Sequence, residues 1–222
     1  LPHGYEGQGP DHSSARPERF LQLCAQNNMT VAMPTLPSNY FHLLRWQVHN
    51  PHHKPLVVFT PKSMLRLKAA ASTSGEFTTG GFRPVIGDAS VDPKAVRKVV
   101  LTAGKVYYDL DAERQKRGVT DLAIIRLERL YPLPGAELQS EIAKYPNAAT
   151  YVWAQEEPAN QGAWPFMALN LIDHLGLVVG ADVPGSGRLR RVSRPHGSSP
   201  AVGSAKRHQA EQEQLVREVF EV

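Results

Sequence analysis

Cysteine is almost absent from the 222-residue chain, which contains only Cys24. A disulfide within the chain needs two cysteines, so none can form, and a cysteine-based zinc site is excluded as well. The segment LQLCAQ predicts that Cys24 is a small core residue of a helix. A chain without disulfides suits a reducing compartment, and we therefore expect a cytoplasmic location.

Long hydrophobic runs are also missing. No stretch approaches the roughly 18 consecutive apolar residues that a membrane-spanning helix needs, and no signal peptide is recognisable, so we expect no membrane association. Charge of one sign is not concentrated either, since the formal net charge is only +4. The one dense basic cluster, Arg188, Arg190, Arg191 and Arg194, is typical of a solvated surface. Nucleic-acid binding through it is the less favoured alternative.

Short apolar runs alternate with helical patterns along the chain. Strands are predicted at 30–33, 55–60, 98–102, 121–127, 149–155 and 188–193. Helices are predicted at 14–27, 37–49, 104–118, 135–145, 162–175 and 205–220. This alternation predicts an α/β fold with a mostly parallel sheet.

Two of these helices have a recognisable apolar face. In the helix at 37–49 the face is predicted from Tyr40, Phe41, Leu44 and Val48. In the closing helix it is predicted from Leu215, Val216, Val219 and Phe220.

A segment rich in Ser, Thr, Gly and Pro separates two series of elements. It predicts a linker, a domain boundary or a surface excursion over residues 67–95. Residues 1–66 then read as the end of one α/β domain, and residues 96–222 as a complete second one. Because the chain begins with Leu1 inside a loop motif, we expect it to be part of a longer polypeptide.

The opening loop LPHGYEGQGPDHSS carries the most suggestive chemistry. Gly4, Gly7 and Gly9 would let the backbone approach a ligand closely. His12 stands just before a helix start, where backbone N–H groups favour anions, and it could donate a hydrogen bond to a carboxylate. The alternative, that His3 and His12 only fix the loop, stays open at this point.

Two loops at the carboxyl ends of predicted strands are further candidates. In TAGKVYYDL the phosphate-loop pattern is absent, so Gly104 predicts a tight turn and Lys105 a surface charge. In QEEPANQGAW the adjacent acids would point opposite ways on an extended chain, which disfavours a catalytic pair. We interpret this loop as an interface formed by Glu156, Glu157, Asn160 and Gln161.

A third group, the histidines of VHNPHHKP, has no carboxylate or cysteine close by. His49, His52 and His53 are therefore expected at the surface, without a metal.

Seven segments together resemble the thiamine-diphosphate-dependent first component of the 2-oxoglutarate dehydrogenase complex. They are PHGYEGQGPDHSSARPERFLQL, PSNYFHLLR, KPLVVFTPKSMLR, GKVYYDL, IIRLERLYPLP, QEEPANQGAWPF and SPAVGSAKRHQAEQEQLV. They occur in order over essentially the whole chain. The 2-oxoadipate enzymes are similar to this pattern too. The chain departs from it at Pro17, at Trp46, where relatives usually carry a second basic residue, and over residues 72–93.

The resemblance implies a domain plan and a set of site residues. It implies that residues 1–66 end a transketolase-like pyrimidine-binding domain and that residues 96–222 form a transketolase-like C-terminal domain. The main residues for thiamine diphosphate and Mg²⁺ would lie upstream. His12 would be catalytic and, with Ser13, substrate-binding. The same active-site loop would include His3, Gly4, Tyr5, Glu6, Gly7, Gln8 and Gly9.

The resemblance also implies an activity and partners. The parent would decarboxylate 2-oxoglutarate oxidatively and pass the succinyl group to lipoyl groups, as a homodimer working with a lipoyl-bearing succinyltransferase and dihydrolipoamide dehydrogenase. The chain alone is expected to be inactive. Two alternatives stay open, a 2-oxoadipate dehydrogenase relative and a non-catalytic module for dimerisation or regulation.

Overall fold

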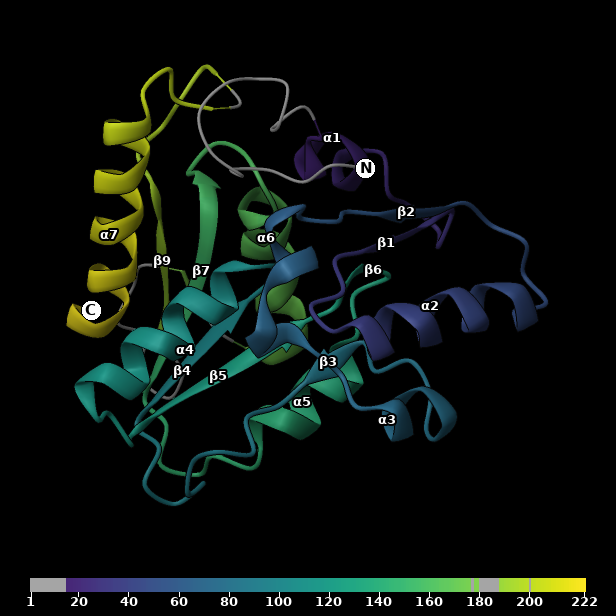
Figure 1. The fold of residues 1–222 in the computed structure, drawn as a ribbon, viewed down its shortest axis with the longest axis horizontal. Helices are drawn as coiled ribbons and strands as arrows, with labels where there is room; N and C mark the ends of the chain where they lie inside the picture. The colour runs from purple at the N-terminus through teal and green to yellow at the C-terminus, as the bar shows by residue number, and fades with distance from the viewer. Residues whose placement is uncertain (1–14, 177, 180–187, 200) are drawn as a thin grey trace.

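The computed structural model describes residues 15–176, 178–179, 188–199 and 201–222. Its larger sheet has six strands in the order β3-β5-β4-β7-β9-β8 (Figure 1). The bounds are β3 Val85–Ile86, β4 Lys98–Thr102, β5 Leu122–Leu127, β7 Thr150–Pro158, β8 Val178–Val179 and β9 Arg188–Arg194. Only β3, at one edge, is antiparallel to its neighbour. The predicted α/β fold with a mostly parallel sheet is confirmed.

Helices cover both faces of this sheet (Figure 1). On one face lie α4 (Val106–Arg117) and α7 (Ala205–Glu221), and on the other α5 (Gly135–Ile142) and α6 (Trp164–Leu175). Alternate residues of the strands supply the two cores. Among the described residues, no helix is long and apolar enough to cross a membrane.

A smaller sheet joins the two parts of the chain that the sequence separates. It has the order β2-β1-β6, with bounds β1 Thr30–Ala32, β2 Leu56–Val58 and β6 Arg129–Tyr131. β6 follows β5 almost directly and pairs antiparallel with β1. Leu21, Val31 and Phe59 also belong to the same hydrophobic cluster as Trp153. The two parts therefore share both a sheet and a core.

The first helix is shorter than predicted. α1 spans Pro17–Gln22, whereas the sequence predicted a helix over 14–27. Gln26 and Asn27 adopt positive φ angles of 51° and 54°, which a right-handed helix cannot contain. Cys24 is only half-buried and lies beyond the helix, so its assignment to a helical core was wrong. Burial raises the pKa of its thiol to about 11.

The second helix has the predicted range but buries a different face. α2 spans Pro37–His49 and buries Ser38, Asn39, His42 and Leu43. The predicted apolar face is largely solvent-exposed, with Phe41 44%, Leu44 46% and Val48 75% exposed.

Polar contacts explain why this face is buried. Asn39 donates to the carbonyl oxygen of Arg83, and His42 Nε2 lies 2.8 Å from the carbonyl oxygen of Glu76. Both partners belong to the 67–95 segment, so α2 is turned toward that segment.

The 67–95 segment is more structured than a plain connection. It contains η3 (Lys68–Ala70), α3 (Ser74–Thr78) and β3, and it comes directly after η2 (Ser63–Arg66). Asp88 fixes it to the larger sheet, because its carboxylate accepts a hydrogen bond from Ile124 N at 2.9 Å. The same carboxylate forms a hydrogen-bonded ion pair with Arg114, whose side chain is 5% exposed.

Removing the carboxylate of Asp88 should destabilise the fold. Asp88→Ala leaves the buried guanidinium of Arg114 short of a partner, and we expect the free energy of unfolding to fall by about 2–4 kcal/mol. Asp92→Ala, an exposed aspartate of the same segment, should cost less than about 1 kcal/mol. Urea unfolding of both variants at neutral pH checks this. Equal losses would mean that the Asp88 pair does not anchor the segment.

Candidate functional site

The carboxyl ends of β4 and β7, two neighbouring parallel strands, bring a lysine and a glutamate together. Gly104 has φ 76°, which confirms the predicted tight turn after β4. The register pairs Thr102 with Ala154, so Lys105 and Glu156 come next to each other beyond it. Their side chains form an ion pair and are 14% and 2% exposed. The interpretation of Lys105 as a surface charge was therefore wrong.

α7 closes this polar cluster from the side. Gln212 Nε2 donates to Glu156 Oε1 at 3.0 Å and to Asp109 Oδ2 at 2.8 Å. His208, on the same helix, has a lowered pKa because of burial first and the positive charges of Arg194 and Lys105 second. The burial and the positive charges around His208 thus favour its neutral imidazole.

Arg194 is the buried member of the basic cluster. It is 2% exposed, and its guanidinium donates to Glu211 Oε2 at 2.9 Å and to Gln212 Oε1 at 2.6 Å. The prediction of a solvated surface was wrong for this residue, whereas Arg191 is exposed. The end of β9 is therefore tied to α7 by charge as well as by packing.

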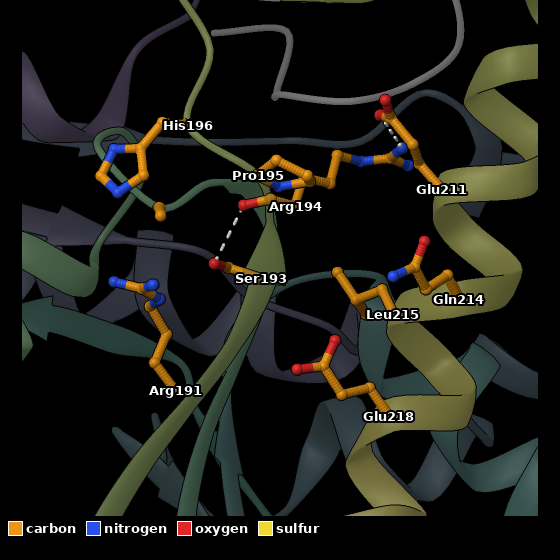
Figure 2. Close-up of a pocket in the computed structure, with 10 residues that line it drawn as sticks. Arg191, Ser193, Arg194, Pro195, His196, Glu211, Gln214, Leu215 and Glu218 are labelled. Atoms are coloured by element: carbon orange, nitrogen blue, oxygen red, sulfur yellow. Dashed lines mark hydrogen bonds and ion pairs between the residues drawn. The ribbon is translucent and has the colours of Figure 1, made fainter. Parts of the chain in front are cut away.

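A cavity of about 160 Å³ lies next to this ion pair, between β9 and α7. Figure 2 shows Arg194 reaching across to Glu211, with Arg191 and His196 on one side and Glu218 on the other. Carboxylates and guanidinium groups are mixed in its walls. A cavity with such balanced charge has no evident preference for a dianionic 2-oxoacid.

The loop after β7 is organised by one side chain. Gln155 is 3% exposed, and its Oε1 accepts from Trp153 Nε1 at 3.0 Å and Trp164 N at 2.8 Å. Its Nε2 donates to the carbonyl oxygens of Pro158 at 3.1 Å and Gln161 at 2.8 Å. These bonds from Gln155, in β7, hold residues 159–163 between β7 and α6 in one shape, and this segment is here named the Gln155 loop.

The predicted interface residues, two at the end of β7 and two in the Gln155 loop, differ in exposure. Glu156, Glu157 and Gln161 are buried within the chain itself, and only Asn160 is exposed. Gln161 Nε2 and Asn160 Nδ2 both donate to the carbonyl oxygen of Gly197, at 2.8 and 2.9 Å. Their contribution to an interface between protomers stays a prediction.

The described part of the chain begins at residue 15, directly after the predicted active-site loop. His12 and Ser13, together with His3, Gly4, Tyr5, Glu6, Gly7, Gln8 and Gly9, lie outside the described residues. α1 begins at Pro17, and Glu18 Oε2 in its first turn accepts a hydrogen bond from Gly162 N at 2.9 Å. The helix that comes after the predicted active-site loop is thus bonded to the Gln155 loop.

A second buried polar cluster, which the sequence pattern did not predict, surrounds Glu128. This residue is 0% exposed, and its carboxyl group accepts from Thr35 N at 2.7 Å, Thr35 Oγ1 at 2.5 Å and Asn39 Nδ2 at 2.9 Å. Burial raises its pKa, although Arg126 and these donors oppose the shift. The charged residues within the apolar run IIRLERLY were the available sequence signal.

Among the described residues, no three His, Cys, Asp or Glu side chains converge in a way that could hold a metal ion. His49, His52 and His53 are exposed, as predicted.

Comparison with known proteins assigns the family. The family model described as 2-oxoglutarate dehydrogenase C-terminal matches residues 71–220, more than half of the chain. The chain belongs to the 2-oxoglutarate dehydrogenase C-terminal family. The model of the transketolase pyrimidine-binding domain matches residues 1–68. The resemblance found in the sequence is confirmed.

Similar proteins cover the whole chain. It is 52% identical to the "2-oxoglutarate dehydrogenase E1/E2 component" of Corynebacterium glutamicum, over 100% of this chain and 18% of that protein. It is 48% identical to the "Multifunctional 2-oxoglutarate metabolism enzyme" of Mycolicibacterium vanbaalenii, over 99% of this chain and 18% of that protein. A protein of the same name from Mycobacterium sp. strain KMS is also 48% identical, over 99% and 17%. The chain thus spans less than a fifth of the length of each of these relatives.

The Gln155 loop should tolerate no side chain at Gly162. Its φ is +68°, and a Cβ atom would lie 2.8 Å from Glu157 Cβ and 2.9 Å from Gln155 Nε2. Gly176 has a similar φ of +62° but nothing within 4 Å of a Cβ. We expect Gly176→Ala to cost about 1 kcal/mol for backbone strain and Gly162→Ala at least about 2 kcal/mol more. Chemical unfolding measures both, and equal costs would contradict the crowding at Gly162.

The raised pKa of Glu128 predicts a pH-dependent contribution to stability. The folded chain keeps this proton at pH values where the unfolded chain, with a carboxyl pKa near 4.5, has lost it. The contribution is complete below that value and is lost as the pH rises through the folded-state pKa. The stability of the wild type relative to Glu128→Gln should therefore fall from about pH 4 upward.

A matched variant at Glu76 should show the opposite dependence of stability on pH. The pKa of Glu76 is lowered, first by the hydrogen bond from the backbone of Thr73. The stability of the wild type relative to Glu76→Gln should therefore rise with pH over the acidic range. Unfolding curves from about pH 3 to about pH 8 compare the two, and slopes of the same sign would contradict the burial effect at Glu128.

Proposed function

We propose that the full-length protein decarboxylates 2-oxoglutarate oxidatively, with thiamine diphosphate as cofactor, and transfers the succinyl group to lipoyl groups in the citric acid cycle. The observation that carries this proposal is the 2-oxoglutarate dehydrogenase C-terminal match over residues 71–220. The 52% identity to an E1/E2 component supports it. The proposed substrate is 2-oxoglutarate, and the isolated chain is inactive in this proposal.

His12 is the proposed catalytic residue of this chain. The substrate carries two carboxylates, and a histidine beside a glycine-rich loop can donate a hydrogen bond to one of them or to an oxyanion. Ser13 adds a hydroxyl donor to the same site. His3, Gly4, Tyr5, Glu6, Gly7, Gln8 and Gly9 form the loop around them in this proposal.

Thiamine diphosphate, when bound, supplies the electron sink that a 2-oxoacid needs to lose CO₂. Its Mg²⁺–diphosphate end is assigned to residues outside this chain. The domain plan rests on the same reasoning: residues 1–66 end a pyrimidine-binding domain, residues 67–95 connect, and residues 96–222 form a transketolase-like C-terminal domain. The chain's part is to bind the substrate and to support the loop that does so.

The proposed assembly is a cytoplasmic homodimer within a multienzyme complex. Its partners are the lipoyl-bearing succinyltransferase and dihydrolipoamide dehydrogenase. Glu156, Glu157, Asn160 and Gln161 are proposed near the dimer interface. Apolar side chains of α2 are exposed in this chain, and such patches often mark interfaces. They support the proposal that α2 packs against another protein surface. The same patch is the observation that favours a module for dimerisation or regulation as second candidate.

Replacing His12 tests the proposed site. In the full-length protein, His12→Ala should lower thiamine-dependent turnover of 2-oxoglutarate at least ~100-fold, because one oxyanion or acid–base group is lost. His53→Ala removes an exposed histidine and serves as the matched control. Assays with 2-oxoadipate and pyruvate compare the alternative substrates. Unchanged turnover in folded His12→Ala would refute the assignment, and faster turnover of 2-oxoadipate would favour that family.

A further inference from the structure

The outward side of α6 is apolar although it meets solvent. The helix buries Trp164, Met167 and Leu171 in the same core as the strands of the larger sheet. On its other side, Leu169 is 71% exposed and Ile172 is 38% exposed. A helix with apolar side chains on both its inner and its outer side is normally buried on both, because each exposed apolar side chain forgoes the free energy gained by leaving water.

The helices on the opposite face of the sheet expose charged side chains instead. Lys116 pairs with Glu113 on α4, and Arg217 pairs with Glu221 on α7. Such ion pairs between residues one turn apart are typical of helix faces that stay in water. The contrast between the two faces of the sheet indicates that α4 and α7 meet solvent, whereas α6 has a surface suited to contact with protein.

The exposed apolar residues of α6 form one stripe, here named the α6 face. It consists of Pro165, Leu169 and Ile172, which follow one another at intervals of four and three residues and are all exposed. Leu23, which is 67% exposed, lies at the carboxyl end of α1, and α1 packs against α6. Exposed apolar surface of this kind marks a site of contact with another protein.

The two ends of the α6 face carry opposite charges. At its amino end, Gly162 N donates to Glu18 Oε2, and the next residue of α1, Arg19, is exposed. At its carboxyl end, Asp173 is exposed. This pattern makes the surface complementary to a second copy of itself. A two-fold axis through the middle of α6 would bring Arg19 of one copy toward Asp173 of the other.

We propose that the α6 face is the centre of an interface between two copies of this chain, with the two α6 helices antiparallel across a two-fold axis. This inference rests on the proposed homodimer and names its surface. Leu169 stands near the middle of α6 and therefore next to the axis. Asn160, exposed in the Gln155 loop directly before α6, joins Arg19 and Asp173 in the polar rim around this apolar centre.

A second copy suits this surface by symmetry as well as by charge. In a two-fold interface each favourable contact occurs twice, so a short apolar stripe is used by both partners. The antiparallel arrangement also brings the amino end of each α6 near the carboxyl end of the other, which favours the two helix dipoles. A stable interface buries about 800 Å² on each partner. The α6 face therefore needs its neighbours, Leu23 and the Gln155 loop, to complete the contact.

The oligomeric state of the full-length protein tests the proposal. Leu169→Glu would place two like charges beside the axis, and it should raise the dimer dissociation constant at least ~100-fold, as for a central interface residue. Val48→Glu, the matched change at a 75% exposed residue of α2, should alter this constant less than ~3-fold. Sedimentation velocity over a series of concentrations measures both constants, and circular dichroism checks that both variants are folded.

Exchanging the two rim charges tests the antiparallel arrangement separately. Arg19→Glu and Asp173→Lys should each raise the dissociation constant at least ~3-fold, because each brings like charges together across the interface. The double variant restores opposite charges, so its constant should return to within ~2-fold of the wild-type value. A double variant that is as weak as the sum of the two single changes would overturn the arrangement.

The remaining outcomes separate the interface from the proposed function. A monomeric wild type, or a Leu169→Glu variant that dimerises like the wild type, would overturn the proposal. Dissociation by Val48→Glu alone would locate the interface on α2 and overturn it as well. Decarboxylation of 2-oxoglutarate is assayed in the same samples. A dimer that depends on Leu169 but lacks this activity would reject the proposed function and support the interface.

Discussion

The buried carboxyl group of Glu128 is the constraint on which the arrangement of the two parts of the chain depends. An acid with no exposed surface must find hydrogen-bond donors, since leaving it without them would cost several kcal/mol. Its donors, Thr35 and Asn39, both come from the first part of the chain. Arg126 adds to this connection, because its Nη1 donates to Thr35 Oγ1 at 3.0 Å. One residue at the end of β5 thus fixes where β1 and α2 must lie.

Buried polar groups that need hydrogen-bond partners also determine the structure at the carboxyl ends of the central strands. Glu156 is buried because Lys105 and Gln212 satisfy it, and Gln155 is buried because four backbone groups and one indole are arranged around its amide. Polar groups, more than apolar packing, determine the shape of this edge of the sheet. Hydrogen bonds fix direction and distance more narrowly than apolar contacts do, so such an edge suits the support of the proposed substrate-binding loop.

The sequence patterns correctly predicted the strands and the helix face that depend on burial of residues close together in the chain. The strands at β4, β5 and β7 were found because both of their faces are buried, which makes nearly continuous apolar runs. The apolar face of α7 was confirmed, since Leu215 and Val219 are buried with Val216 and Phe220 against them. The buried face of α2 was missed because Asn39 and His42 bond to partners more than 30 residues away. The exposure of Lys105 was wrongly predicted for the same reason, because its partner Glu156 is distant in the sequence. The bond between Glu18 and Gly162 likewise produces no periodic pattern in the sequence.

The pairing of β6 with β1 bears on how this protein can be divided. A cut within residues 67–95 would look safe from composition, yet it would strip β6 of its only partner strand among the described residues. The exposed backbone of such a strand is a template for unwanted pairing, and Leu130, now fully buried, would meet water. A fragment that is expressed from the end of this segment onward would therefore carry an unpaired strand edge that can pair with other chains. The boundary between folding units here does not coincide with the boundary in composition.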